Sequence, residues 1–173
     1  MFSNDEKLME TNKRFDKVKK VAVFADVQNI YYTTRQEYNR QFDYRKLWQR
    51  ISDQGEIVFA NAYAIDRGNE QQLKFQQVLK QIGFTVKLKP YIQRSDGSSK
   101  GDWDVGIAID VMETAKDVDA IVLLSGDGDF SLLLEKIRQH GTSSEVYGVP
   151  TLTAQSLIDA ANFYHPIDEE LLI

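Results

Sequence analysis

Apolar residues follow two different periods along this chain, and the periods separate expected helices from expected strands. Five segments place apolar side chains at positions i, i+3, i+4 and i+7, which is the pattern of a helix with one buried face. These segments are Tyr44/Leu47/Trp48/Ile51, Phe75/Val78/Leu79/Ile82, Val105/Ala108/Ile109/Met112, Phe130/Leu133/Leu134/Ile137 and Ala154/Leu157/Ile158/Ala161. Short apolar runs lie before and between them and predict strands at 21–25, 57–65, 84–88, 120–124 and 144–148.

The alternation of these strands and helices predicts an α/β fold. It is typical of a three-layer α/β/α sandwich, Rossmann-like, with a mostly parallel sheet of five or six strands joined by right-handed crossovers. The runs VAVFA (21–25) and AIVLL (120–124) are apolar on both faces, as central strands are. If these two are neighbours, the strand order is 3-2-1-4-5. The more alternating FTVKL (84–88) and SEVYG (144–148) are then expected at the edges.

Length and composition narrow the class of protein. The 173 residues predict one domain over 21–173, preceded by a charged arm or helix over 1–20. The net charge of −5 argues against a passive nucleic-acid coat protein. The chain has no cysteine and only two histidines, so thiolate metal sites are excluded and a histidine-rich zinc site is not expected. No signal peptide or membrane-spanning run is readable, and a cytoplasmic protein without membrane contact is expected.

Three aspartates stand where a strand or loop meets a helix. Asp26 follows VAVFA, Asp104 lies in KGDWDVGIAID, and Asp127 lies in AIVLLSGDGDF. Carboxylates at the carboxyl ends of strands can converge in the crevice where the order of an open α/β sheet reverses. Converging acids repel one another unless a cation lies between them, and carboxylate oxygens suit Mg²⁺ or Mn²⁺. The pattern therefore predicts a divalent-metal site.

Asp26 and Asp127 also have structural explanations. An Asp after a strand often caps the next helix through its side-chain oxygen, and Asp26 is placed to do so. Asp127 lies in the turn SGDG, where every residue suits a cap or a tight turn. One cap needs one acceptor, however, and the stretch supplies Ser125, Asp127 and Asp129, with two glycines that would let the backbone approach a ligand. The ligand-binding interpretation is therefore favoured there.

The helix that begins near residue 104 carries further acids. Asp102 is the expected N-cap, which leaves Asp104 in the first turn, where the helix dipole stabilises a carboxylate, free to point into the crevice. Asp110 falls on a different face of this helix, so the two acids are not expected to hold one ion. Asp110 lies between apolar neighbours, and it is either a paired, half-buried acid or a catalytic one.

Polar and basic residues near these acids are candidates for contact with a phosphate. Asn29 can hold a metal-bound water, a phosphate or the Asp26 carboxylate. Lys100 can contact a phosphate or support a carboxylate, and a solvated loop lysine is the alternative. Arg67, at the end of the second strand, can bind a phosphate or simply complete a turn. Ser125 is a further candidate for substrate contact.

Basic and aromatic residues suggest a surface for a nucleic-acid strand. The polar stretch 90–101, with Lys87, Lys89 and Arg94 nearby, could form a basic wall beside a nucleic-acid backbone. Arg94 is a candidate substrate-binding residue on that wall. Tyr31 and Tyr32 can stack on bases, although two aromatics that begin a helix are more often packing residues.

At these residues the chain resembles the NYN domain family, in particular its LabA-like bacterial branch within the PIN-like ribonucleases. The matching motifs are FADVQN, KGDWDVGIAID and LLSGDGDFSLLLEKIRQHG, and the likeness covers residues 21 to about 165. The resemblance implies a PIN-like fold and Mg²⁺- or Mn²⁺-dependent hydrolysis of RNA. By position, the matches to the family's acidic site and its supporting residues are Asp26, Asp104, Asp127, Asn29, Asp129 and Lys100. Asp110 matches a recurrent family acid without an assigned role.

The leading hypothesis is a metal-dependent endoribonuclease in which water attacks the phosphorus. Its expected metal ligands are Asp26, Asp104, Asp127 and Asp129, with Asn29 and Lys100 assisting catalysis. One alternative is a weak or inactive module of the same fold that binds RNA or a protein partner. Another is a phosphatase or nucleotide hydrolase with an Asp nucleophile, because Asp127-Gly-Asp129 superficially resembles a haloacid dehalogenase signature. That signature belongs at the end of the first strand, where this chain has DVQN. The edge strands and the charged arm could each support a homodimer.

Overall fold

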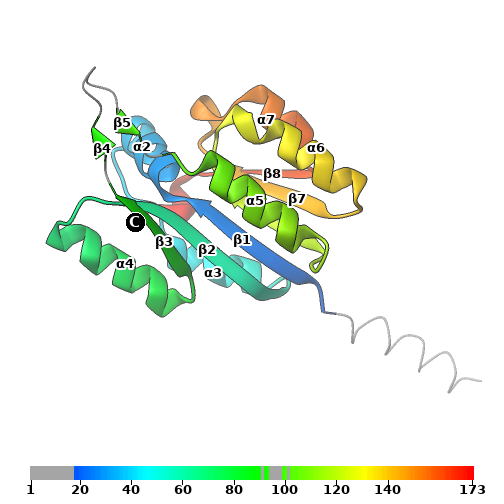
Figure 1. Ribbon diagram of the computed structural model, residues 1–173, viewed down its shortest axis with the longest axis horizontal. Coiled ribbons are helices and arrows are strands. Elements are labelled where there is room, and N and C mark those ends of the chain that lie inside the picture. The colour runs from blue at the N-terminus through cyan, green and yellow to red at the C-terminus, as the bar shows by residue number, and fades with distance from the viewer. Residues whose placement is uncertain (1–17, 91, 94–98, 101) are drawn as a thin grey trace, which may run out of the picture.

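Six parallel strands form one sheet, and helices lie on both of its faces (Figure 1). The computed structural model describes residues 18–90 and 102–173, and the backbone of residues 92–93 and 99–100. Residues 1–17 of the expected charged arm therefore lie outside the described residues, and Lys20 already belongs to the first strand. No helix within the described ranges is long and apolar enough to cross a membrane.

The order of the strands confirms the predicted α/β class and topology. The strands of the large sheet are β1 (Lys20–Asp26), β2 (Glu56–Asp66), β3 (Thr85–Pro90), β6 (Ala120–Leu124), β7 (Ser143–Gly148) and β8 (Phe163–Pro166). They lie in the order β3-β2-β1-β6-β7-β8, which is the predicted 3-2-1-4-5 order with a sixth strand added. Two short strands, β4 (Ile92–Gln93) and β5 (Ser99–Lys100), pair with each other in a separate antiparallel ladder.

The helices divide between the two faces of the sheet (Figure 1). The helices are α2 (Val27–Tyr38), α3 (Tyr44–Ser52), α4 (Glu70–Ile82), α5 (Asp104–Ala115), α6 (Ser131–Gln139) and α7 (Gln155–Ala160). Three short 3₁₀ turns are η1 (Gly128–Phe130), η2 (Pro150–Leu152) and η3 (Glu169–Leu171). Buried side chains of α3 and α4 belong to one hydrophobic core, and those of α5, α6 and α7 belong to a second.

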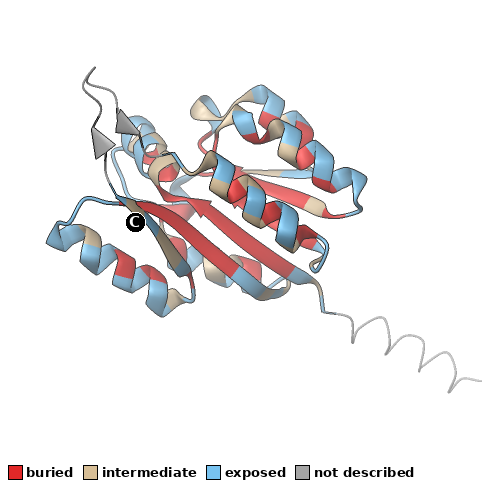
Figure 2. Ribbon diagram, in the orientation of Figure 1, coloured by how far each residue is buried: buried red, intermediate tan, exposed pale blue. Residues whose placement is uncertain are grey.

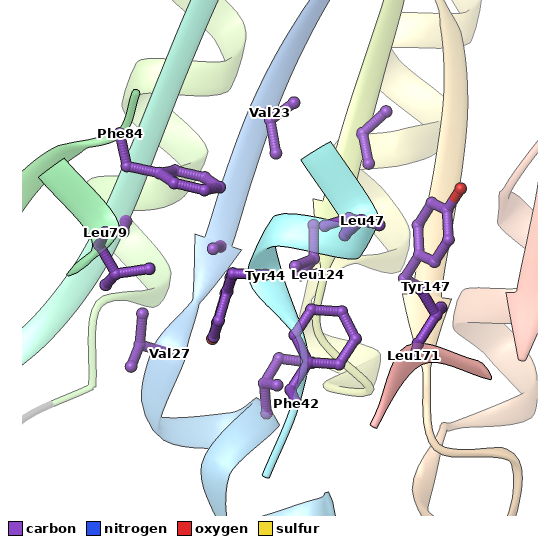
Figure 3. Close-up of a cluster of buried hydrophobic side chains, with 14 of the residues drawn as sticks. Val23, Val27, Phe42, Tyr44, Leu47, Leu79, Phe84, Leu124, Tyr147 and Leu171 are labelled. Atoms are coloured by element: carbon purple, nitrogen blue, oxygen red, sulfur yellow. The ribbon is translucent and has the colours of Figure 1, made fainter. Parts of the chain in front are cut away.

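The central strand β1 is buried on both faces because it contributes to both cores (Figure 2). Val21, Val23 and Ala25 face the α3/α4 core, whereas Ala22 and Phe24 face the α5/α6/α7 core. Figure 3 shows the α3/α4 core, in which apolar and aromatic side chains from helices and strands pack around β1. This double burial explains why VAVFA is apolar at every position.

Of the two predicted edge strands, only one lies at an edge of the sheet. All of FTVKL except Phe84 lies in β3, which is an edge strand as predicted. The prediction that SEVYG is an edge is wrong, because β8 pairs with β7 from Glu145 to Gly148 and takes the edge position. The four residues of β8 end in a proline and gave no recognisable strand signal. Helix α2 was not among the five apolar segments because only Val27, Ile30 and Thr34 of its residues are buried.

The last described residues complete the α3/α4 core. The backbone N–H of Asp43 donates to the carbonyl of Leu171, and Phe42 forms an isolated antiparallel bridge with Leu172. Leu171 is fully buried and lies beside Tyr147 of β7 in this core (Figure 3). The segment after β8 therefore packs against the residues that lead into α3.

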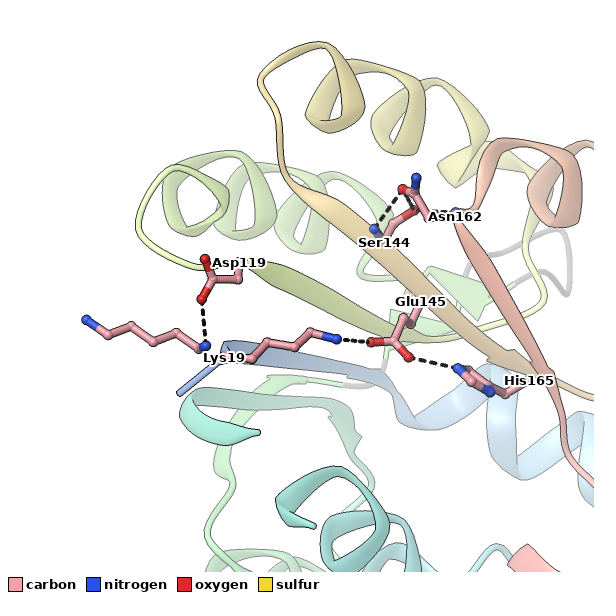
Figure 4. A network of polar contacts seen from close by, with 7 residues as sticks. Lys19, Asp119, Ser144, Glu145, Asn162 and His165 are labelled. Atoms are coloured by element: carbon pink, nitrogen blue, oxygen red, sulfur yellow. Dashed lines mark hydrogen bonds and ion pairs between the residues drawn. The ribbon is translucent and has the colours of Figure 1, made fainter. Parts of the chain in front are cut away.

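A polar network joins the start of β1 to the far edge of the sheet (Figure 4). The Glu145 carboxylate accepts a hydrogen bond from Lys19 Nζ at 3.2 Å and lies 2.8 Å from His165 Nε2. Although burial acts to raise it, the pKa of the Glu145 carboxyl is lowered, above all by the hydrogen bond with His165. This network engages one of the two histidines of the chain.

Candidate metal centre

The predicted acids lie at the carboxyl edge of the sheet, where the strand order reverses. Strands β1 and β6 are hydrogen-bonded neighbours, and Ala25 pairs with Leu124 at their ends. Asp26 and Ser125 therefore leave the sheet at the same level. The chain turns into α2 after β1 and into η1 after β6, so two helical segments diverge from one point. A crevice at such a point is the usual ligand site of an open α/β sheet.

A network of side chains and backbone groups fixes the two loops to each other. The Asp26 carboxylate caps α2 by accepting from the Asn29 N–H at 3.4 Å, and it also accepts from the Ser125 hydroxyl at 3.1 Å. The Asn29 side-chain oxygen accepts from the Gly126 N–H at 2.9 Å. The Ser125 hydroxyl oxygen in turn accepts from the Asp127 N–H at 3.2 Å. Asp26 is thus both a helix cap and a link across the crevice.

Three carboxylates gather beside this network. One oxygen from each of Asp104, Asp127 and Asp129 lies within 4.8 Å of the other two. Asp127 also caps η1, because its carboxylate accepts from the Asp129 N–H at 2.9 Å. Asp26, predicted as a fourth ligand, is not in this group of three, although its charge interacts with that of Asp127. The structure therefore brings three of the four predicted ligands within reach of a single ion.

Burial and mutual repulsion raise the pKa of two of these acids. Burial raises the pKa of Asp26 to about 6, against the opposing hydrogen bonds from Ser125 and the Asn29 N–H. Burial, a hydrogen bond shared with Asp127 and the neighbouring negative charges raise the pKa of Asp104 to about 7. In the absence of another positive charge, the Asp104 carboxyl is therefore partly protonated near neutral pH, and the Asp26 carboxyl becomes protonated as the pH falls through about 6.

Trp103 positions Asp104 and was not recognised in the sequence. Its ring nitrogen donates to the carbonyl of Ala64 at 2.8 Å, which ties the start of α5 to β2. A Cβ at Gly106 would lie 2.7 Å from the Trp103 ring, so the glycine three residues later is the signal that could have revealed this packing. Asp102 is not the N-cap that was predicted: the cap residue is Trp103, and the Asp102 carboxylate accepts from the Asp104 N–H at 3.4 Å.

The glycines of the SGDG turn serve internal packing rather than close approach to a ligand. A Cβ on Gly126 would lie 2.5 Å from the carbonyl oxygen of Leu152, and one on Gly128 would lie 2.9 Å from Ala154 Cβ. The turn therefore rests directly on residues 152–154. The expectation that these glycines open the backbone to a ligand is therefore wrong. Thr153, which lies against Gly126, was not recognised from the sequence.

Replacing Gly126 with Ala is expected to destabilise the domain by about 2 kcal/mol, because the added carbon overlaps a backbone oxygen. Urea unfolding measures this change. Gly68→Ala is the matched control, since a Cβ there meets open space and only the positive φ of 72° is unfavourable, at about 1 kcal/mol. Equal free energies of unfolding for the two variants would contradict the packing argument.

Asp110 is a paired, half-buried acid, which was the structural interpretation of this residue. Its carboxylate accepts from Lys87 Nζ at 2.7 Å and from the Tyr63 hydroxyl at 2.7 Å. Burial acts to raise the pKa of Asp110, but the hydrogen bonds from Lys87 and Tyr63 and the Lys87 charge outweigh it and lower the pKa. Lys87 is consequently engaged in an ion pair and is not part of an open basic wall. Lys89 lies 4.3 Å from the centre of the Trp103 ring.

Asp110→Asn is expected to lower stability by about 1 kcal/mol at pH 7, because a half-exposed ion pair is lost. The folded protein holds the Asp110 proton less tightly than the unfolded chain does. This contribution is therefore fully present above the ordinary Asp pKa, and it declines below that value until the pH has fallen through the lowered pKa of the folded state. Thermal melts at pH 7 and pH 3 measure the difference between variant and parent. A loss that is equal at both pH values would contradict the role of the ion pair.

The residues predicted to bind substrate lie in different surroundings. Ser125 is fully buried and its hydroxyl is bonded inside the protein, so it positions Asp26 and cannot contact a substrate directly. Arg67 follows β2 at the same edge of the sheet, and its guanidinium donates to the Tyr32 hydroxyl at 3.2 Å. Arg94 and the side chain of Lys100 lie outside the described residues.

Comparison with known proteins assigns the family. The model of the NYN domain matches residues 20–168. The chain belongs to the NYN domain family. This NYN domain is 30% identical over 158 residues to the low amplitude and bright protein LabA of Synechococcus elongatus, with 87% of this chain and 84% of that protein covered. A crystal structure of a protein of unknown function from Vibrio parahaemolyticus is 51% identical, with a TM-score of 0.87 over 91% of this chain and 98% of that one. The family and the strand order together establish a nuclease-type fold.

Proposed function

We propose that this NYN domain is an endoribonuclease that hydrolyses RNA with a divalent cation, Mg²⁺ or Mn²⁺. The observation that carries the proposal is the group of three carboxylates at the switch point of the sheet, with Asp26 next to it. Asp104, Asp127 and Asp129 would hold the cation, and Asp26 would add negative charge to the same crevice. The predicted assistance by Lys100 at the leaving oxygen is part of this proposal.

The donor set fits such a cation. Carboxylate oxygens are the ligands that Mg²⁺ and Mn²⁺ take in proteins. The raised pKa values of Asp26 and Asp104 indicate that the crevice favours an added positive charge, whether protons or a metal ion. A bound divalent cation would lower the pKa of a water molecule and offset negative charge on the phosphate.

Side chains within the described ranges fix the geometry of the site, and none of them is placed as a nucleophile, which leaves water in that role. Ser125 and Asn29 hold the β1 and β6 loops at a fixed separation, which orients the acids. The Ser125 hydroxyl is buried and bonded to Asp26, so it is not an available nucleophile. His165 is bonded to Glu145 and His140 follows α6, so neither imidazole is placed as a base at the acids.

Purified protein incubated with 5′-labelled RNA, DNA and a simple phosphomonoester tests the proposal. We expect cuts in RNA when Mn²⁺ or Mg²⁺ is present and none with a chelator. Binding of RNA without any cut, in every metal tested, would instead favour a regulatory module. Release of phosphate from the monoester alone would favour a phosphatase. Restoring Mn²⁺ after chelation is expected to restore the cuts, which separates metal loss from irreversible unfolding.

A further inference from the structure

A groove of about 440 Å³ lies along α2, the helix that Asp26 caps, and none of the acids lines it. It is lined by four residues of α2 and one that follows β2, namely Tyr31, Tyr32, Arg35, Gln36 and Arg67. We call it the tyrosine–arginine groove. The two tyrosine side chains are about half exposed, 47% and 48%, although α2 has a buried face to which they could have contributed. Packing alone therefore does not account for two adjacent aromatics at this place.

Each tyrosine of the groove is in contact with an arginine. The Tyr31 and Tyr32 rings meet edge to face with their centres 5.5 Å apart. Arg35 lies over the Tyr31 ring, 5.7 Å from its centre, and donates to the Tyr31 hydroxyl. Arg67 donates to the Tyr32 hydroxyl at 3.2 Å. These contacts hold two aromatic rings and two guanidinium groups together on one exposed surface.

The groove is close to the acids because one helix carries both. Asp26 caps α2, and Tyr31 and Tyr32 lie five and six residues further along. The helical rise of 1.5 Å per residue places the tyrosines about 8 Å along the axis from Asp26. Strand β2 neighbours β1 and ends at the same carboxyl edge of the sheet (Figure 1). Arg67 is the residue that follows this strand. A strand whose phosphate reaches the acids can therefore place its next nucleotides in the groove.

We infer that the tyrosine–arginine groove binds an unpaired nucleobase and the adjoining phosphate of a single RNA strand. An exposed aromatic ring offers a face on which any base can stack, and a guanidinium pairs with phosphate oxygens. A base inside a duplex has both faces covered by its neighbours, so the groove selects unpaired RNA. The net charge of −5 provides no general attraction for RNA, so the binding of its phosphates depends more on the two local arginines. The direction of the strand toward the acids rests on the proposed function.

Binding measured without cleavage tests this inference. We would use the full chain carrying Asp127→Asn, in EDTA, with a fluorescent single-stranded oligouridylate of about 10 nucleotides. Tyr32→Ala and Arg67→Ala are each expected to weaken its binding about tenfold, whereas Tyr32→Phe keeps most of the affinity because the ring remains. Arg35 lies on the exposed side of α2. The variant Arg35→Ala therefore gives a second test if a Tyr32 variant folds poorly.

Matched controls remove the same kinds of group elsewhere. Phe163→Ala removes an exposed aromatic on β8, and Lys80→Ala removes an exposed positive charge from the last turn of α4. Both are expected to leave the affinity for oligouridylate unchanged. An equal loss in the controls and the groove variants would overturn the inference, as would equal affinity for an RNA duplex of the same length.

The outcome is separable from that of the proposed function. If oligouridylate binds and the groove variants lose it, but the wild type never cuts RNA, the groove stands and the nuclease proposal falls. If the wild type cuts RNA and kcat/KM is unchanged in Tyr32→Ala and Arg67→Ala, the nuclease stands and the groove inference is overturned. A wild type that binds no single-stranded RNA at all would also overturn it.

Discussion

Asp127→Asn is expected to lower metal-dependent RNA cleavage by about 10³-fold or more while the domain stays folded. Asp127 belongs to the group of three carboxylates, and its loss removes one charge from the site. The cap of η1 survives, because an Asn side-chain oxygen can still accept from the Asp129 N–H. The effect should therefore fall on catalysis and metal affinity. Initial rates on labelled RNA, measured over a range of Mn²⁺ concentrations, determine it.

Asp117→Asn is the control for this loss. Asp117 is exposed just beyond the end of α5, whereas Asp104 stands at the start of that helix, so the same chemical change is made far from the acids. Its rate is expected to equal that of the wild type. Cleavage that persists at the wild-type rate in Asp127→Asn would place the metal, and the reaction, elsewhere. Circular dichroism spectra of both variants check that the fold is retained.

Asp26→Asn is expected to make the metal-free protein more stable at pH 8 and to leave it unchanged at pH 4. Because the folded-state pKa of Asp26 is raised to about 6, the folded protein binds this proton more tightly than the unfolded chain. The resulting stability is complete below the ordinary Asp pKa and is lost as the pH rises through 6. A rise from 3.8 to about 6 corresponds to roughly 3 kcal/mol at high pH. The neutral Asn avoids this loss, and thermal melts in EDTA across this pH range measure the gain.

Metal ions should reverse the order of stability that Asp26→Asn and the wild type show in EDTA at pH 8. Mn²⁺ stabilises the wild type by binding only the folded state, and protons compete for the same carboxylates, so the rise in Tm should be larger at pH 8 than at pH 5. Asp26→Asn should show a smaller rise, whereas Asp117→Asn should behave as the wild type does. A variant that is destabilised equally at pH 4 and pH 8 would show that Asp26 acts chiefly as a helix cap.

The sequence predicted the parts of the site that depend on strand order. Asp26 directly follows one run of five apolar residues, and Asp127 lies three residues after the end of another. Both runs were recognisable as central strands, and neighbouring central strands bring their ends together. Asp104 and Asp129 were found because acids beside a helix start are easily recognised. Strand β3 was correctly placed at an edge because its residues alternate.

The parts that the sequence did not reveal depend on contacts between distant segments. Nothing near Ser125 indicates that its hydroxyl is enclosed, because the partner carboxylate lies 99 residues away in Asp26. Trp103 and Thr153 act by touching glycines, and a glycine alone does not indicate which side chain fills the space beside it. Strand β8 was missed because four residues ending in proline carry too little periodicity.

The contact between residues 41–43 and residues 171–173 bears on how the protein folds during synthesis. The N–H of Ile173 donates to the carbonyl of Gln41, and that of Asp43 donates to the carbonyl of Leu171, so these pairs join segments about 130 residues apart. The ribosome releases the early segment long before its partner exists. Until then, the apolar surface around Phe42 and Tyr44 has no cover from Leu171 and Leu172. Nascent chains halted just before residue 171 are therefore expected to present this apolar surface to aggregation and to chaperone binding.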